Sequence, residues 1–151
     1  MKKYLKILLI IILAIVVVVG VVIFVANNAL KEAAKLQAYD FGDDKLRSFT
    51  SVVGERKVTG VGTSSSTSGV QQKNYTYDTQ TSAEDFIAYH NALGAAGYLV
   101  TQSKEGDDLK GSIQYGCESA DDGKIVQVDL SWENNRFAVE LTKMIGTVTP
   151  K

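Results

Sequence analysis

The sequence is poor in the residues that most often carry chemistry. It has a single cysteine, Cys117, and a single histidine, His90. One cysteine cannot form an internal disulfide, so an exported domain of this kind has to be held together by packing. The chain also lacks the cysteine and histidine pairs of zinc sites, and no nucleophile elbow or dinucleotide fingerprint is present. We therefore expect that the protein is not an enzyme and that it has no catalytic, cofactor-binding or metal-binding residues.

The isolated candidates for chemistry have simpler interpretations. Cys117 alternates with Ile113 and Tyr115, which favours an interior thiol in a strand over an intermolecular disulfide or a catalytic thiol. His90 is expected to be a half-buried helix residue. Paired aspartates lie in or beside predicted turns, where aspartate is common, and none has the spacing of a calcium loop. These pairs are Asp43–Asp44, Asp107–Asp108 and Asp121–Asp122.

Basic charge is scarce beyond residue 26. Three of the 16 lysines and arginines precede that point, which leaves 13 against 17 aspartates and glutamates, a net charge of −4. A nucleic-acid-binding domain needs a basic face, and a lipid-binding patch needs clustered lysines and arginines. The composition therefore argues against nucleic acid as a partner and against a polybasic membrane contact.

The most informative feature present is an apolar run over residues 7–26. It holds no charge and no proline, and Lys2, Lys3 and Lys6 precede it. A helix of this length spans the ~30 Å hydrocarbon core of a bilayer. The pattern predicts a single-pass transmembrane helix, with the lipid bilayer as its partner. Because positive charge stays on the cytoplasmic side, residues 1–6 are predicted to be inside the cell and the remaining chain outside.

A cleaved signal peptide is the alternative for this run. The run is longer than the usual ~7–15 residue core of a signal peptide. Cleavage after Ala26 or Ala29 would place Phe24 or Asn27 at the third position before the cut, where a small residue is needed. An uncleaved anchor is therefore favoured. The layout resembles that of small surface proteins of Gram-positive bacteria, and this resemblance implies a location but no function.

The segment that follows the apolar run has good helix formers. Apolar residues recur at three- and four-residue spacing between Ala26 and Leu36, which predicts a helical juxtamembrane stalk over residues 27–41. Tyr39 and Phe41 lie at its end, where they either pack under the domain or contact a partner. Residues 42–151 are long enough for one extracytoplasmic domain with one core.

The first part of that domain reads as a strand pair. Asp43 and Asp44 cap one short turn through Leu46 and Phe49. A strand is predicted over 50–61 with a bulge at Gly54, followed by a flexible loop from Gly62 to Gly69 and a returning strand over 70–79.

One helix and four strands complete the predicted fold. Thr81–Glu84 and Ser82–Asp85 each match a capping box, and the helix runs to Ala96 with Gly97 as its C-cap. Strands are predicted over 98–104, 109–118, 124–132 and 136–143, joined by hairpin turns. The fold class is therefore α+β: a transmembrane helix followed by a two-layer domain of one helix on an antiparallel sheet, in the order β-β-α-β-β-β-β.

The alternation in the last strands predicts one apolar and one wet sheet face. Asp129 and Glu140 lie on the wet face and, with Tyr39 and Phe41, form the candidate partner surface. The leading functional hypothesis is a membrane-anchored extracytoplasmic interaction module that contacts a protein partner or a cell-envelope component. A small-ligand sensor or binding domain is the alternative, with its site between helix and sheet or on the wet face.

Overall fold

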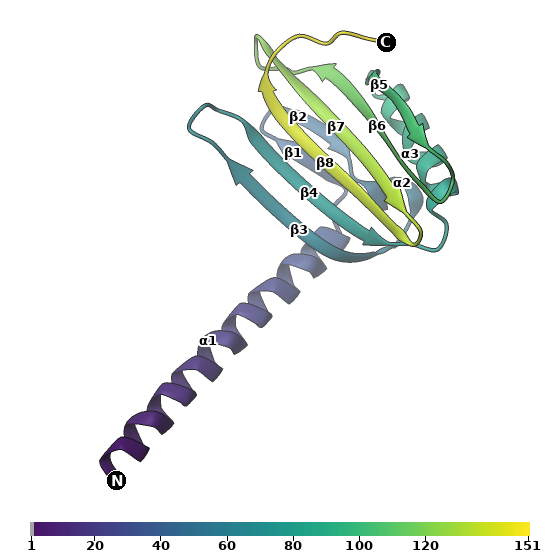
Figure 1. The fold of residues 1–151 in the computed structure, drawn as a ribbon. Coiled ribbons are helices and arrows are strands. Elements are labelled where there is room, and N and C mark those ends of the chain that lie inside the picture. The colour runs from purple at the N-terminus through teal and green to yellow at the C-terminus, as the bar shows by residue number, and fades with distance from the viewer. Residues whose placement is uncertain (1) are drawn as a thin grey trace.

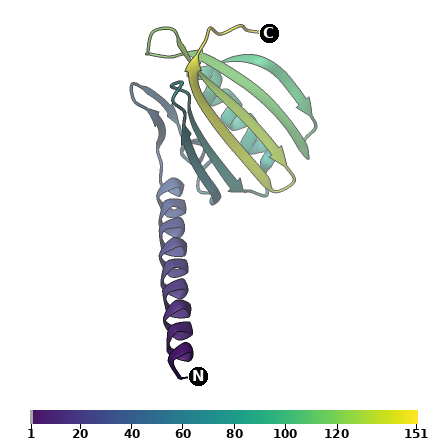
Figure 2. The ribbon, with the colours of Figure 1, turned by 60° about the vertical axis from the view of Figure 1, so that its left-hand side comes forward.

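A long helix at the N-terminus leads into a domain built of strands and short helices (Figures 1 and 2). The computed structural model describes residues 2–151, and their side chains from Ile7 onward. Helix α1 runs from Lys2 to Ala34, and its part from Ile7 is long and apolar enough to cross a membrane. Every side chain from Ile7 to Ala29 is exposed. The basic side chains predicted to lie in the cytoplasm fall outside the described ones.

The predicted stalk is helical only as far as Ala34. Strands β1 (Ala38–Phe41) and β2 (Asp44–Arg47) follow as an antiparallel hairpin. The turn is formed by Gly42 at φ +77°, and the Gly42 amide donates to the Asp40 carboxylate at 2.8 Å. This hairpin replaces the predicted helical end of the stalk and the predicted turn through Leu46, because alternate apolar side chains in both strands face the core.

A short helix stands where the sequence pattern favoured a strand. Helix α2 covers Phe49–Val53, and the Ser48 side chain caps its first turn by accepting the Ser51 amide at 3.2 Å. Gly54, at φ +87°, ends the helix. The β-branched residues of this segment favour a strand locally, but the cap and the left-handed glycine override that preference.

The first strand of the main sheet begins and ends later than the predicted 50–61, and the second lies within the predicted 70–79. Strand β3 covers Lys57–Ser65 and strand β4 covers Gln71–Asp78. Thr63 to Ser65 pair with Gln71 to Lys73, so half of the predicted flexible loop is strand. These serines and threonines lie at the exposed end of the hairpin. Because they show no apolar alternation, the sequence pattern predicts a loop there.

Helix α3 (Ser82–Ala95) confirms the predicted helix, and Gly97 at φ +87° confirms its C-cap. The predicted capping box does not form. The Asp85 carboxylate instead forms an ion pair with Arg56 at 2.6 Å and accepts the Thr79 hydroxyl at 2.5 Å. Asp85 is buried, so this ion pair connects the start of α3 to the loop before β3.

Four further strands complete the sheet: β5 (Leu99–Gly106), β6 (Lys110–Glu118), β7 (Lys124–Glu133) and β8 (Arg136–Ile145). The six strands lie in the order β3-β4-β8-β7-β6-β5, and every neighbouring pair is antiparallel. The predicted α+β class and the four-strand meander are confirmed. Strand β4 joins the meander through β8.

One face of the sheet is covered by α2, α3 and the β1–β2 hairpin (Figure 1). Aromatic side chains fill the space between the layers. The Phe49 ring lies 4.4 Å from that of Phe137 and 4.7 Å from that of Tyr77. The Tyr39 hydroxyl contacts the Tyr77 hydroxyl at 2.7 Å and accepts the Phe49 amide at 3.0 Å. The buried tyrosine hydroxyls are thus satisfied inside the core.

Candidate functional site

The second face of the main sheet carries no helix or hairpin and is called here the open face. Alternation places polar and small side chains on it from the central strands. Its members on β4, β8, β7 and β6 are Gln72, Asn74, Thr76, Ala138, Glu140, Thr142, Gln127, Asp129, Ser131, Ser112 and Gln114. Most of the opposite residues of these strands lie in the buried core.

The two acidic candidates from the sequence meet on this face. Asp129 and Glu140 are direct partners in the β7–β8 register, and both side chains are half-buried. Asp129 accepts the Gln114 amide at 2.8 Å and the Gln127 amide at 2.7 Å, and Glu140 accepts the Gln72 amide. Among the described residues, neither carboxylate has a lysine or arginine within ion-pair distance.

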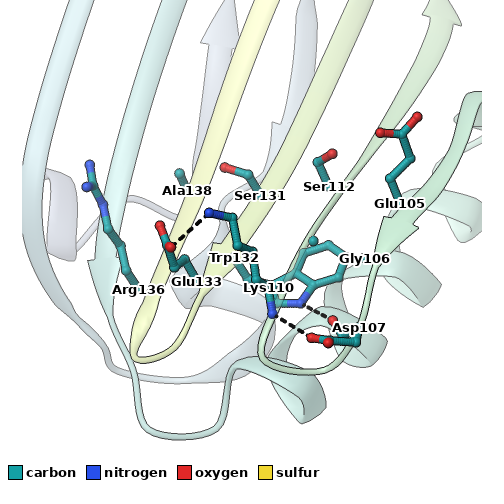
Figure 3. Close-up of a pocket in the computed structure, with 11 residues that line it drawn as sticks. Glu105, Gly106, Asp107, Lys110, Ser112, Ser131, Trp132, Glu133, Arg136 and Ala138 are labelled. Atoms are coloured by element: carbon teal, nitrogen blue, oxygen red, sulfur yellow. Dashed lines mark hydrogen bonds and ion pairs between the residues drawn. The ribbon is translucent and has the colours of Figure 1, made fainter.

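A hollow of about 700 Å³ lies at one end of the open face (Figure 3). A cross-strand row of small side chains, Ala138, Ser131 and Ser112, runs along it. The next row toward the β7–β8 turn carries Arg136, Glu133 and Lys110. The full lining is Glu105, Gly106, Asp107, Lys110, Gly111, Ser112, Ser131, Trp132, Glu133, Arg136 and Ala138.

The β5–β6 hairpin shapes the far end of this hollow. The Asp107 carboxylate accepts the backbone amides of Leu109 at 2.8 Å and Lys110 at 3.0 Å, and these hydrogen bonds lower its pKa. The Trp132 indole donates to the Asp107 carbonyl at 2.8 Å. A Cβ atom at Gly111 would come within 2.4 Å of the indole ring, so only glycine allows the indole to lie against this hairpin.

A buried ion cluster lies on the covered face, at the opposite end of the sheet. Lys143 is 3% exposed, and its Nζ contacts Asp44 at 2.6 Å and Asp121 at 2.9 Å. It also donates to the Phe41 carbonyl at 3.1 Å. Burial opposes ionisation of Asp44, but hydrogen bonds from Lys143, Ser119 and the Ala120 amide outweigh it and lower the Asp44 pKa. The cluster ties the β1–β2 hairpin to the sheet.

His90 is half-buried, as predicted. Its Nδ1 lies 2.6 Å from the Tyr115 hydroxyl, and its ring stacks on Phe86 at 5.7 Å. Cys117 is half-buried in β6; burial, followed by the negative charges of Asp44 and Glu118, raises the pKa of its thiol. Within residues 7–151, no group of three or more histidine, cysteine or acidic side chains is arranged to hold a metal.

The other two candidates for a partner surface are not on the surface. Tyr39 is 1% exposed and Phe41 is 5% exposed, and both belong to the domain core. The prediction of a contact surface at these two residues is therefore wrong, and the alternative that they pack under the domain holds. Alternating strand geometry turns both toward the sheet, which a helical stalk would not do.

The sequence did not single out the residues of the hollow. Alternation and the short β6–β7 and β7–β8 turns together imply that Ser112, Ser131 and Ala138 share one row, so a signal was present. The link from Gln72 to Glu140 depends on the pairing of β4 with β8, which are distant in the chain.

No protein-family model, curated protein or solved structure matches this chain.

Proposed function

We propose that this chain is a single-pass, membrane-anchored interaction module, and that its open face contacts a protein partner or a cell-envelope component. The observation that carries the proposal is the contrast between the two sheet faces. One face is covered by α2, α3 and the β1–β2 hairpin, whereas the other presents polar side chains around a pair of facing carboxylates.

The facing carboxylates favour a cationic partner. Like charges directly opposite each other on neighbouring strands repel and lower the stability of a sheet. The amides of Gln72, Gln114 and Gln127 satisfy the oxygens of Asp129 and Glu140 without neutralising their charge. A lysine or arginine side chain of a partner would relieve this repulsion on binding, and the net charge of −4 beyond residue 26 acts in the same direction.

The proposed location follows from the anchor. The three lysines before Ile7 favour a cytoplasmic N-terminus, so the domain lies outside the membrane of a bacterial cell. Eight helical residues from Asn27 to Ala34 separate the apolar run from the hairpin, a rise of ~12 Å. The open face would then stand close above the membrane, within reach of other envelope proteins.

Charge reversal tests the contact. In Glu140→Lys the new ammonium group faces Asp129, so the free energy of unfolding should stay within ~0.5 kcal/mol of the unchanged protein or rise slightly. Partner capture by cross-linking in the parent cells should fall about tenfold, since a favourable charge contact becomes repulsive. Asp122→Lys is the matched control, because it makes the same change of charge at an exposed turn residue away from the open face. Undiminished capture by Glu140→Lys would refute the proposed contact surface.

Thiol labelling tests the orientation. With Cys117 changed to Ser, a cysteine at Ser65 stands at the exposed end of β3. A membrane-impermeant maleimide should modify it in intact cells, whereas a cysteine at Lys3 should react only after lysis. The opposite pattern would place the domain in the cytoplasm.

A further inference from the structure

The hollow on the open face has the features of a small binding site. The hollow exists because the side chains of Ala138, Ser131 and Ser112 are shorter than those in the rows on either side. The row on one side holds Arg136, Glu133 and Lys110, and the row on the other holds Glu140, Asp129 and Gln114. A trough crossing the strands results, and Figure 3 shows its short floor with the charged row beside it.

Four polar side chains in the hollow have no partner among the described residues. Arg136, Ser131, Ser112 and Glu105 form no side-chain hydrogen bond or ion pair there, and all four are exposed. Their neighbours differ: Lys110 pairs with Glu133 at 2.9 Å, and Asp129 and Glu140 accept glutamine amides. Unused hydrogen-bonding groups thus collect in the hollow.

These four groups are ordered by charge across the sheet. Arg136 lies on β8 and Glu105 on β5, with Ser131 on β7 and Ser112 on β6 between them. Neighbouring strands are ~4.8 Å apart, so three spacings separate the backbones of Arg136 and Glu105 by ~14 Å. An extended peptide advances ~3.3 Å per residue, so a tripeptide covers ~10 Å of that distance. The side chains of Arg136 and Glu105 supply the rest.

We propose that the hollow binds a short peptide with free amino and carboxyl termini, lying across the strands. Its carboxylate binds the Arg136 guanidinium in the two-bond geometry that arginine favours. Its ammonium group binds the Glu105 carboxylate, and its peptide groups meet the hydroxyls of Ser131 and Ser112. The inference rests on the proposed function, in which the open face is the contact surface.

Other ligand classes fit this hollow less well. A simple anion would use Arg136 but would meet the carboxylates of Glu105 and Glu133 in the same hollow. A sugar is usually held by an exposed aromatic ring, but Trp132, the aromatic residue that lines the hollow, is 2% exposed. Opposite charges at the two ends with hydroxyls between them match a zwitterionic peptide.

The test uses the full chain in nanodiscs and three peptides: trialanine, its N-acetyl form and its C-terminal amide. Binding is followed by Trp132 fluorescence and by isothermal titration calorimetry. Trialanine should bind about tenfold more tightly than either capped form, because each cap removes one charge-assisted contact. Equal binding of all three peptides, or no binding of any, would overturn the inference.

Variants assign each end of the peptide. Arg136→Gln should abolish the preference for the free carboxylate and keep the preference for the free ammonium group, and Glu105→Gln should do the reverse. Lys57→Gln, an exposed change on β3, should keep both preferences. If Arg136→Gln weakened all three peptides equally, the assigned orientation would be wrong. If the protein discriminated between free and capped peptides but Glu140→Lys still captured the partner fully, only the proposed function would be overturned. If Glu140→Lys lost the partner but the protein bound free and capped peptides equally, only this inference would be overturned.

Discussion

A soluble chain that begins at residue 28 is expected to unfold cooperatively, whereas one that begins at residue 42 is not. The second boundary is the one that the sequence pattern favours, since it follows the predicted stalk. In the structure it removes β1 and three buried side chains, Ala33, Tyr39 and Phe41. The membrane-proximal segment is therefore part of the domain core as well as a connection to the anchor.

The expected loss is large relative to the stability of a small domain. Removing one fully buried aromatic side chain costs ~3–5 kcal/mol, and a domain of this size is stable by ~5–15 kcal/mol. The shorter chain lacks two such side chains, and the Tyr77 hydroxyl and the Phe49 amide lose the Tyr39 oxygen. Strand β2 also loses β1, its partner in the two-stranded sheet.

Urea unfolding followed by circular dichroism and Trp132 fluorescence measures the difference. Tyr39→Ala in the longer chain is the intermediate case and should lower the free energy of unfolding by ~3–5 kcal/mol. Tyr39→Phe should cost less, because it keeps the ring and removes only the hydroxyl. A cooperative transition with an unchanged midpoint in the chain that begins at residue 42 would refute this account.

The sequence predicted the part of the fold whose signals are local. Helix α3 has acidic residues in its first turn and a glycine at its end, and strands β6 to β8 alternate cleanly between short turns. The β1–β2 hairpin has no comparable signal. Each strand has only four residues, and the segment before it has helix-compatible spacing without glycine or proline. Its structure depends on burial against the sheet, which is non-local.

The candidate site was predictable to the same extent. Alternation placed Asp129 and Glu140 on one face, and the tight β7–β8 turn sets them opposite each other. Tyr39 and Phe41 were expected at the end of a helical stalk, and the sequence left open whether they pack under the domain or contact a partner. The hollow was missed because alternation and the tight turns put Ser112, Ser131 and Ala138 in one row, but nothing in the sequence marks a row of short side chains as a hollow.

A comparably large effect of a single substitution is expected at Lys143, whose ammonium group is buried among Asp44, Asp121 and the Phe41 carbonyl. Lys143→Ala should lower the free energy of unfolding by ~3–5 kcal/mol, because it leaves the Asp44 carboxylate, which is only 12% exposed, without its cation. Lys124→Ala is the matched control. Lys124 also pairs with Asp121, at 3.2 Å, but its side chain is 35% exposed. The Lys124→Ala substitution should therefore lower the free energy of unfolding by less than ~1 kcal/mol.

A second variant separates charge from packing. Lys143→Met keeps most of the side-chain volume and should still be strongly destabilised, whereas Lys143→Met combined with Asp44→Asn should recover much of the loss, because no buried charge then remains unpaired. If the double variant were no more stable than Lys143→Met, the effect would come from packing.

Acid pH should reduce the difference between the unchanged protein and Lys143→Met. In the unchanged protein the pKa of Asp44 is lowered below its usual value near 4, so this carboxylate contributes stability above that pH and the contribution is lost as the pH falls through the folded-state pKa. In Lys143→Met, burial acts without the neutralising lysine and should raise the Asp44 pKa. Protonation of Asp44 as the pH falls should therefore recover part of the stability that the variant lost. Urea unfolding at pH 7 and at successively lower pH should therefore show two stability curves that converge on acidification. Parallel curves would mean that Asp44 does not carry the effect of the substitution.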